Sequence, residues 1–185
     1  MPLLTVVPRN SQPTPCDTTQ PTTTVLIYCP DSSMALQATL DSLLKQTYRE
    51  MEVLLLHKPD FMGSPSIYAQ LSKIDLNGVV RMLEVGDSAE VDEALNLGFL
   101  VASGELMLPL ISGDEIASST LESCLERFKV HPCVDVVYTN VQTCESVPPE
   151  NQADGCSFEL RQSPIAIPYP AMIRRASQSQ YLPMR

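Results

Sequence analysis

The chain has 185 residues, a length typical of one domain that buries a hydrophobic core without disulfide or metal cross-links. Hydrophobic residues make up 44% and charged residues 18%, which is typical of a globular protein rather than a disordered one. Twelve basic and 22 acidic residues give a net charge of −10, which argues against a nucleic-acid-binding protein and against a polybasic membrane-surface protein.

The sequence shows neither a secretion signal nor a membrane span. Pro2, Pro8 and Arg9 interrupt the apolar stretch that a signal peptide would need. No uncharged apolar run reaches the roughly 18 residues that predict a transmembrane helix. The six cysteines lack the clustered spacing of a zinc site, so we interpret most of them as small buried apolar residues. We therefore expect a soluble, reduced, cytoplasmic protein without a transmembrane segment.

Proline content divides the chain into three regions. Residues 1–21 are rich in Pro and Thr, which predicts a flexible, disordered N-terminal arm. Residues 144–185 are again rich in proline and are interpreted as a tail. The residues between these regions, 22–143, are expected to form the ordered domain.

Within residues 22–143, short apolar runs alternate with segments that have the period of a helix. The apolar runs predict strands at 24–29, 52–57, 79–84, 106–111 and 133–139. The periodic segments predict helices at 34–48, 66–74, 88–103 and 119–129. This alternation predicts an α/β fold with a mostly parallel central sheet and helices on both faces.

Sheets of this kind bind ligands beyond the carboxyl ends of their strands, so those ends are the positions to examine for a site. They comprise residues 29–33, 57–60, 84–87, 111–115 and 139–143. The first of them, Pro30-Asp-Ser-Ser33, lacks the glycine-rich motif of a dinucleotide site, and the chain has no P-loop motif. A pair formed by Cys29 and His57, at the ends of predicted strands, is a further possibility for catalysis by a thiol.

Three segments resemble the family 2 glycosyltransferases in sequence and in spacing. Ser42-Leu-Leu-Lys-Gln-Thr-Tyr-Arg-Glu-Met-Glu-Val53 is similar to the passage from the first helix to the second strand of that family. Ala94-Leu-Asn-Leu-Gly98 with Ala102-Ser-Gly-Glu105 resembles a later helix-to-strand passage. Leu110-Ile-Ser-Gly-Asp-Glu115 lies where the family has Leu-Asp-x-Asp-Asp. The resemblance covers residues 24–140 and implies a Rossmann-like GT-A domain that binds a nucleotide-sugar donor.

The resemblance also implies which residues bind the donor and its counter-ion. A nucleoside diphosphate is strongly anionic, and Mg²⁺ or Mn²⁺ with oxygen ligands is its usual countercharge. The need is greater here because residues 82–126 contain ten acidic residues and no Lys or Arg. The residues implied for nucleotide-sugar binding are Pro30, Asp31, Ser33, His57, Asn96 and Asp114. Those implied for a divalent metal are Asp114 and Glu115.

Departures from the family pattern leave two functions open. Ile111 and Gly113 stand where the family has the Asp residues of its Asp-x-Asp motif, and His57-Lys58 replaces acidic residues that contact base and ribose. Residues 144–185 are few for an acceptor-binding half and are interpreted as its remnant. We expect either a glycosyltransferase with an unknown sugar, lipid or protein acceptor, or a truncated or degenerate module that binds without catalysis. No residue is assigned as catalytic.

Several of these residues also have a structural interpretation. Asp114 can cap the helix that follows it, or close a turn with Gly113. Asn96 can belong to a packing motif with Gly98, in which the helix approaches the sheet closely. The Arg174-Arg175 pair can hold a phosphate or can simply be solvated.

Overall fold

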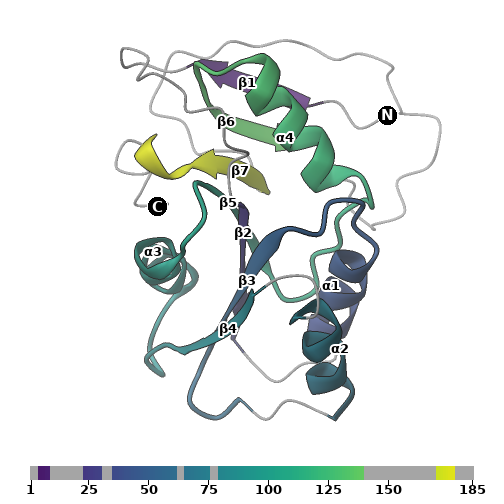
Figure 1. The fold of residues 1–185 in the computed structure, drawn as a ribbon. Helices are drawn as coiled ribbons and strands as arrows, with labels where there is room; N and C mark the ends of the chain where they lie inside the picture. The colour runs from purple at the N-terminus through teal and green to yellow at the C-terminus, as the bar shows by residue number, and fades with distance from the viewer. Residues whose placement is uncertain are drawn as a thin grey trace, which may run out of the picture.

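The computed structural model describes residues 4–8, 23–30, 35–61, 65–75, 79–139 and 170–177. These residues form a seven-stranded sheet with helices packed on both faces (Figure 1). The strands are β1 (Leu4–Pro8), β2 (Thr23–Cys29), β3 (Met51–His57), β4 (Val79–Glu84), β5 (Leu106–Ile111), β6 (Val134–Thr139) and β7 (Ala171–Arg174). The helices are α1 (Ala35–Leu44), α2 (Pro65–Asp75), α3 (Val91–Val101) and α4 (Thr120–Val130), and a short 3₁₀ turn, η2 (Arg175–Ser177), follows β7. Every predicted strand and helix is present, with ends that differ by a few residues.

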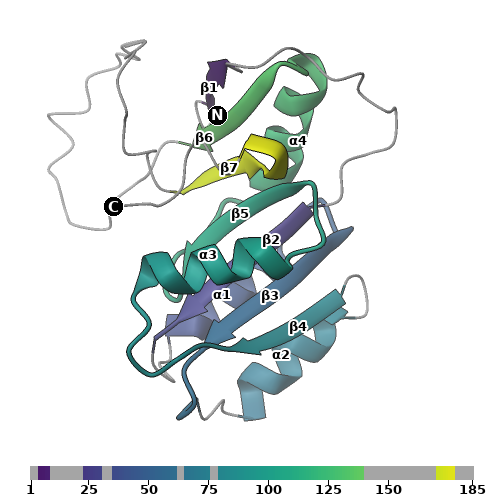
Figure 2. The same ribbon diagram turned by 90° about the vertical axis from the view of Figure 1, so that its left-hand side faces the viewer.

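The sheet has a parallel part and an antiparallel part (Figure 2). Its strand order is β1-β6-β7-β5-β2-β3-β4. The strands β5, β2, β3 and β4 are parallel to one another, as their alternation with helices predicted. β7 is antiparallel to both of its neighbours, β5 and β6, and β1 is antiparallel to β6. The α/β prediction is therefore confirmed, for a sheet that is mixed as a whole.

The two faces of the sheet carry different helices. α1, α2 and α4 cover one face, and α3 covers the other (Figure 1). Along β2, Val25 and Ile27 pack toward the first group of helices, whereas Leu26 and Tyr28 pack toward α3. Burial on both faces is the physical reason why β2 has a continuous apolar sequence.

α3 lies close to the sheet at Gly98. A Cβ atom at this position would lie 2.9 Å from Cδ1 of Leu56 and 3.2 Å from Cδ2 of Leu26. Any larger residue would push the helix away from the sheet or displace these leucines. The interpretation of Asn96 and Gly98 as a motif that lets the helix approach the sheet is therefore supported for Gly98.

Two strands come from regions that the sequence assigned to an arm and a tail. Leu4–Pro8, within the region 1–21 that is expected to be a disordered arm, forms β1 and pairs with β6. Their Leu-Thr-Val-Val sequence favours a strand, but the prolines around it dominate the composition of the region. Ala171–Arg174, expected in the tail, forms β7 between β5 and β6, and its residues are buried. Most other residues of the two regions lie outside the described residues.

Within the described ranges, no helix has the length and apolar character that crossing a membrane requires. Of the cysteines described there, Cys29 and Cys124 are buried and Cys133 is exposed. Burial raises the pKa of the Cys124 thiol to about 12. Cys124 is thus a neutral, small apolar residue of the core at any physiological pH.

Candidate functional site

The carboxyl ends of the parallel strands meet at one edge of the sheet. Cys29 lies opposite His57, and His57 lies opposite Glu84. On the other side of β2, Tyr28 lies opposite Ile111. The strands β5, β2, β3 and β4 therefore end side by side at what we call the carboxyl edge. The opposite end of these strands, where they begin, is called the amino edge.

Three of the predicted donor-binding residues lie at the carboxyl edge. Pro30 directly follows β2, His57 is the last residue of β3, and Asp114 lies in the turn after β5. All three are half-buried. Asp31 and Ser33, in the loop after Pro30, lie outside the described residues and stay predictions.

Asn96 and Glu115 are the remaining predicted site residues. Asn96 lies in the second turn of α3 and is half-buried. Because α3 follows β4, its N-terminal end lies near the carboxyl edge. Glu115 follows Asp114 and is exposed. Asn96 stays a prediction as a donor contact, and Glu115 as a metal ligand.

Asp114 closes the turn after β5. Its backbone N–H donates to the carbonyl oxygen of Ile111 at 2.9 Å, and its carboxylate Oδ2 accepts from the N–H of Ile111 at 2.6 Å. The N–H of Ser112 donates to the carbonyl oxygen of Tyr28 at 2.9 Å, which ties the turn to β2. The turn interpretation of Asp114 is therefore correct, since its backbone and its side chain both bind within the turn.

Gly113 fixes the other side of this turn. Its φ is +106°, a conformation that glycine adopts freely and other residues adopt rarely. Its N–H donates to Oγ1 of Thr39 at 2.9 Å, and a Cβ atom would lie 3.4 Å from Cβ of Ala35. Thr39 is fully buried on α1, and the sequence gives no sign of this role beyond a polar residue in a helix.

One ring nitrogen of His57 is engaged by the chain itself. Its Nδ1 lies 2.9 Å from the carbonyl oxygen of Lys58. Because a carbonyl oxygen only accepts hydrogen bonds, Nδ1 carries the proton of the ring. Nε2 is therefore a hydrogen-bond acceptor. The ring packs against Phe61, with 5.1 Å between ring centres. Cys29, opposite His57, is fully buried, which argues against the thiol mechanism.

Acidic residues surround the carboxyl edge on its β4 side. They are Glu84, Asp87, Glu90, Asp92 and Glu93, and most are exposed. Asp92 and Glu93 lie in the first turn of α3, where they complement the positive end of the helix dipole. Lys58 follows β3 directly and brings a positive charge to the same edge. These negative charges would repel an anionic ligand such as a diphosphate. The positive charge of Lys58 would reduce this repulsion.

Tyr28 connects the end of β2 with the loop before α3. Its hydroxyl donates to the carbonyl oxygen of Ala89 at 2.9 Å. Burial, and then the negative charges of Glu90 and Cys29, raise the pKa of Tyr28. The hydroxyl is therefore a protonated donor at physiological pH, and it holds this loop at the carboxyl edge.

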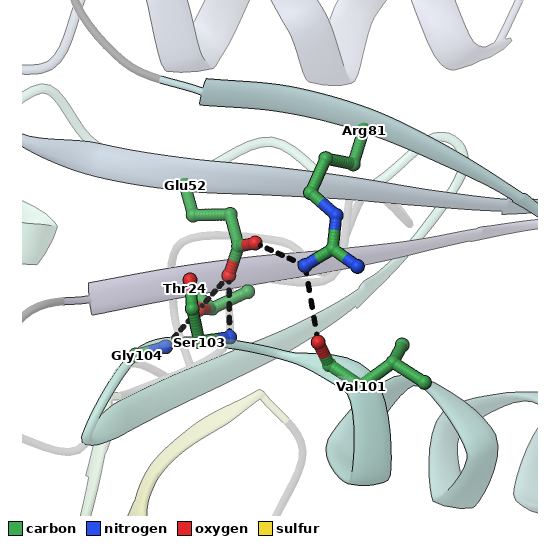
Figure 3. A network of polar contacts seen from close by, with 6 residues as sticks. All are labelled: Thr24, Glu52, Arg81, Val101, Ser103 and Gly104. Carbon is green, nitrogen blue, oxygen red and sulfur yellow. Dashed lines mark hydrogen bonds and ion pairs between the residues drawn. The ribbon is translucent and has the colours of Figure 1, made fainter.

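A buried carboxylate lies at the amino edge (Figure 3). Oε2 of Glu52 accepts from Oγ1 of Thr24 at 2.6 Å and from the N–H of Ser103 at 2.8 Å. Oε1 accepts from Nη1 of Arg81 at 2.8 Å, and the N–H of Gly104 donates to Oγ1 of Thr24 at 2.8 Å. Burial would raise the pKa of Glu52, but these hydrogen bonds outweigh it and lower the pKa to about 2. Two of the segments that carry the family resemblance thus meet in a structural contact.

The Gln-Thr pair of the first of those segments is structural as well. Nε2 of Gln46 donates to the carbonyl oxygen of Ala117 at 2.7 Å, and Oε1 of Gln46 accepts from the N–H of Leu121 at 3.2 Å. Oγ1 of Thr47 donates to Oε2 of Glu122 at 2.6 Å. These bonds join the end of α1 to the start of α4, which positions the loop after β5.

Arg174 of β7 has its partners inside the fold. Its Nη1 lies 2.6 Å from Oε1 of Glu105, and its guanidinium carbon lies 5.2 Å from the ring centre of Phe128. Arg174 lies opposite Leu106, the first residue of β5, and is therefore at the amino edge. Arg174 supports the packing of β7 there and does not reach the carboxyl edge.

The fold is that of GT-A glycosyltransferases. The family model "Glycosyl transferase family 2" matches residues 24–179. Since this match covers most of the chain, the chain belongs to glycosyl transferase family 2. A search of curated proteins finds no significant match.

Solved structures of glycosyltransferases are similar to this one. The Staphylococcus aureus TarS fragment 1–349 superposes with a TM-score of 0.62 and 17% identity, over 84% of this chain and 47% of that one. The same fragment in complex with UDP-GlcNAc gives 0.61 and 18%, over 84% and 45%. The mannosyltransferase PcManGT from Pyrobaculum calidifontis, in complex with GDP-Man and Mn²⁺, gives 0.51 and 19%, over 70% and 38%. Identities this low show the fold, and the chain spans less than half the length of each of these proteins.

Among the described residues, the motif positions after β5 offer few ligands to a divalent cation. Ile111 and Gly113, at the positions of the family's Asp-x-Asp motif, offer no side-chain oxygen. One carboxylate oxygen of Asp114 already accepts from a backbone N–H. In the part of the chain that the structure describes, no group of three or more His, Cys, Asp or Glu residues is placed to hold a metal ion.

Proposed function

We propose that this chain binds a nucleotide-diphospho-sugar at the carboxyl edge, as the donor-binding part of a glycosyltransferase. The observation that carries this proposal is the meeting of four parallel strand ends in a GT-A fold, with Pro30, His57 and Asp114 at that edge. Ligands of open α/β sheets bind at such an edge. The similar structures whose names include UDP-GlcNAc and GDP-Man support a nucleotide-sugar as the ligand. The proposed acceptor is a sugar, a lipid or a protein, and the donor base and sugar are left open.

The residues of this edge have separate parts in the proposed binding. Pro30 ends β2 at this edge, and Asp31 and Ser33, which follow it in the sequence, are proposed as further donor contacts. Nε2 of His57 accepts a hydrogen bond from the base or ribose, and Lys58 supplies positive charge nearby. Asp114 holds the turn after β5 in place. Asn96, on α3, is proposed as a further polar contact.

A second candidate is a module that binds the donor and does not transfer its sugar. The turn after β5 favours this candidate, because Ile111 and Gly113 replace the carboxylates of the family motif and Asp114 binds inside the turn. Both candidates share the donor site and differ only in turnover.

Calorimetry of the full chain with UDP, GDP and their sugar conjugates tests the donor site. We expect binding of at least one of them, and we expect His57→Ala to weaken it by about fivefold or more, as loss of one hydrogen bond to a ligand predicts. His131→Ala is the matched control, because His131 is the other histidine of the chain and is exposed after α4. Failure of every nucleotide to bind would refute the proposed function.

Release of nucleoside diphosphate from the bound sugar conjugate separates the two candidates. A rate above that of the donor alone in buffer supports the transferase, whose donor is then hydrolysed slowly by water when no acceptor is present. Tight binding without release supports the binding module.

A further inference from the structure

The turn after β5 differs from what a metal-dependent member of this family requires. We propose that Asp114 is a positioning residue that closes this turn, and that the chain binds its nucleotide donor without a divalent cation held by the protein. The donor part of this inference rests on the proposed function, whereas the part that concerns Asp114 and the metal rests on the turn itself.

The carboxylate of Asp114 is occupied by the turn. Its Oδ2 accepts from the N–H of Ile111 at 2.6 Å, a short distance typical of a charge-assisted hydrogen bond. The backbone N–H of Asp114 donates back to the carbonyl oxygen of Ile111 at 2.9 Å. With Oδ2 engaged in this way, Asp114 alone supplies far fewer oxygens than the six or so that a divalent cation takes.

The backbone conformation of the turn also disfavours a second carboxylate at the neighbouring motif position. Gly113 has φ of +106°, and its N–H is held by Oγ1 of buried Thr39. A residue with a side chain is strained in this conformation, so Gly113 is required by the shape of the turn. Ile111, at the other motif position, is half-buried and apolar.

Glu84, the acidic residue at the end of β4, is too far along the sheet to complete a site with Asp114. Glu84 ends β4, which is separated from β5 by β2 and β3. Three strand spacings of about 4.8 Å place the ends of β4 and β5 roughly 14 Å apart. Ligands of one divalent cation lie within about 2.6 Å of it, so Glu84 and Asp114 do not share an ion.

Of the two residues His57 and Lys58, Lys58 carries the positive charge that can partly neutralise the donor. They follow one another at the end of β3, directly beside β2, and both are half-buried. A protonated amine close to a diphosphate neutralises part of its charge without a metal ion. At the end of β3, His57-Lys58 stands in place of acidic residues, and after β5 the carboxylates of the family motif are missing. Both changes remove ligands for a metal ion, and the first also adds positive charge.

Titration of the full chain with Mn²⁺, followed by electron paramagnetic resonance, tests the metal part without any nucleotide. The expected result is no site with a dissociation constant below about 1 mM. A site tighter than about 0.1 mM that Asp114→Asn removes would overturn the inference. Calorimetry of UDP and GDP in EDTA and in Mn²⁺ then tests the donor part, with affinities expected to agree within about twofold. An affinity at least tenfold higher in Mn²⁺, and lost in Asp114→Asn, would also overturn it.

Thermal unfolding of two variants tests the role of Asp114 in the turn. Asp114→Ala removes the acceptor and is expected to lower Tm by about 3–6 °C, whereas Asp114→Asn keeps an amide oxygen for the N–H of Ile111 and is expected to lose less than half of that. Equal Tm values for Asp114→Ala and the unmodified chain would overturn this role. If no nucleotide binds in either buffer, the proposed function fails, and the Mn²⁺ titration and the Tm values still decide the inference.

Discussion

The two edges of the sheet differ in how their charged side chains are used. At the amino edge, Glu52 binds Thr24, Ser103 and Arg81, and Glu105 pairs with Arg174. At the carboxyl edge, most of the acidic residues are exposed, and the carboxylate of Asp114 serves its own turn. Three sequence segments identify the family, and most of their polar contacts hold the fold. The positions where the sequence departs from the family lie instead at the edge where the donor is proposed to bind.

Removal of the Glu52 carboxylate is the largest change expected at the amino edge. Glu52→Ala leaves Thr24, Arg81 and the N–H of Ser103 without their common acceptor, and we expect the free energy of unfolding to fall by about 3 kcal/mol. Urea denaturation measures this change. Glu50→Ala, an exposed glutamate two residues earlier, is the control and is expected to change it by less than about 0.5 kcal/mol. Equal effects of the two variants would contradict the importance of the buried contact.

Acid should weaken the same contact. Because the pKa of Glu52 is lowered to about 2 in the folded chain, its ionised form stabilises the fold above its ordinary pKa, and this contribution is lost as the pH falls toward 2. Between pH 6 and pH 3, Glu52 is expected to account for a loss of about 2 kcal/mol in the free energy of unfolding. Urea midpoints over this range, compared with those of Glu52→Gln, measure it. A pH dependence that is the same in the variant would contradict this assignment.

Gln46 follows the end of α1 and joins this helix to the start of α4. Gln46→Ala removes its bonds to Ala117 and Leu121, and we expect a loss of about 2 kcal/mol in the free energy of unfolding. Urea denaturation measures the loss, and Gln37→Ala, in a half-buried position of α1, is the control. A loss no larger than that of the control would show that the two helices are held together by apolar packing alone.

The close approach of α3 to the sheet should tolerate little added volume. In Gly98→Ala, the new methyl group meets the tips of Leu56 and Leu26, so the expected cost is about 1 kcal/mol, partly offset by the better helix propensity of alanine. Gly86→Ala is the matched control, since a Cβ atom at Gly86 meets nothing within 4 Å. Thermal unfolding of both variants decides, and a larger loss at Gly86 would contradict the packing role of Gly98.

Local sequence patterns predicted five of the seven strands, the four helices and the edge that carries the candidate site. Apolar runs and helical periods are local properties, so β2 and α3 could be recognised without knowledge of their neighbours. The place of β7 between β5 and β6 could not, because it depends on pairing between residues far apart in the chain. For Asp114, the residue type suggested both a ligand and a turn, and only the distance to the N–H of Ile111 shows what the carboxylate binds.

The difference between the two edges is tested most directly by mapping where a nucleotide binds. Backbone amide signals of the full chain are recorded in nuclear magnetic resonance spectra during titration with UDP and with GDP. The account predicts that the largest shifts occur at the carboxyl edge, at Cys29, His57 and Ser112, and that Ser103 and Gly104 at the amino edge change little. Shifts confined to the amino edge, or no shifts with either nucleotide, would contradict it.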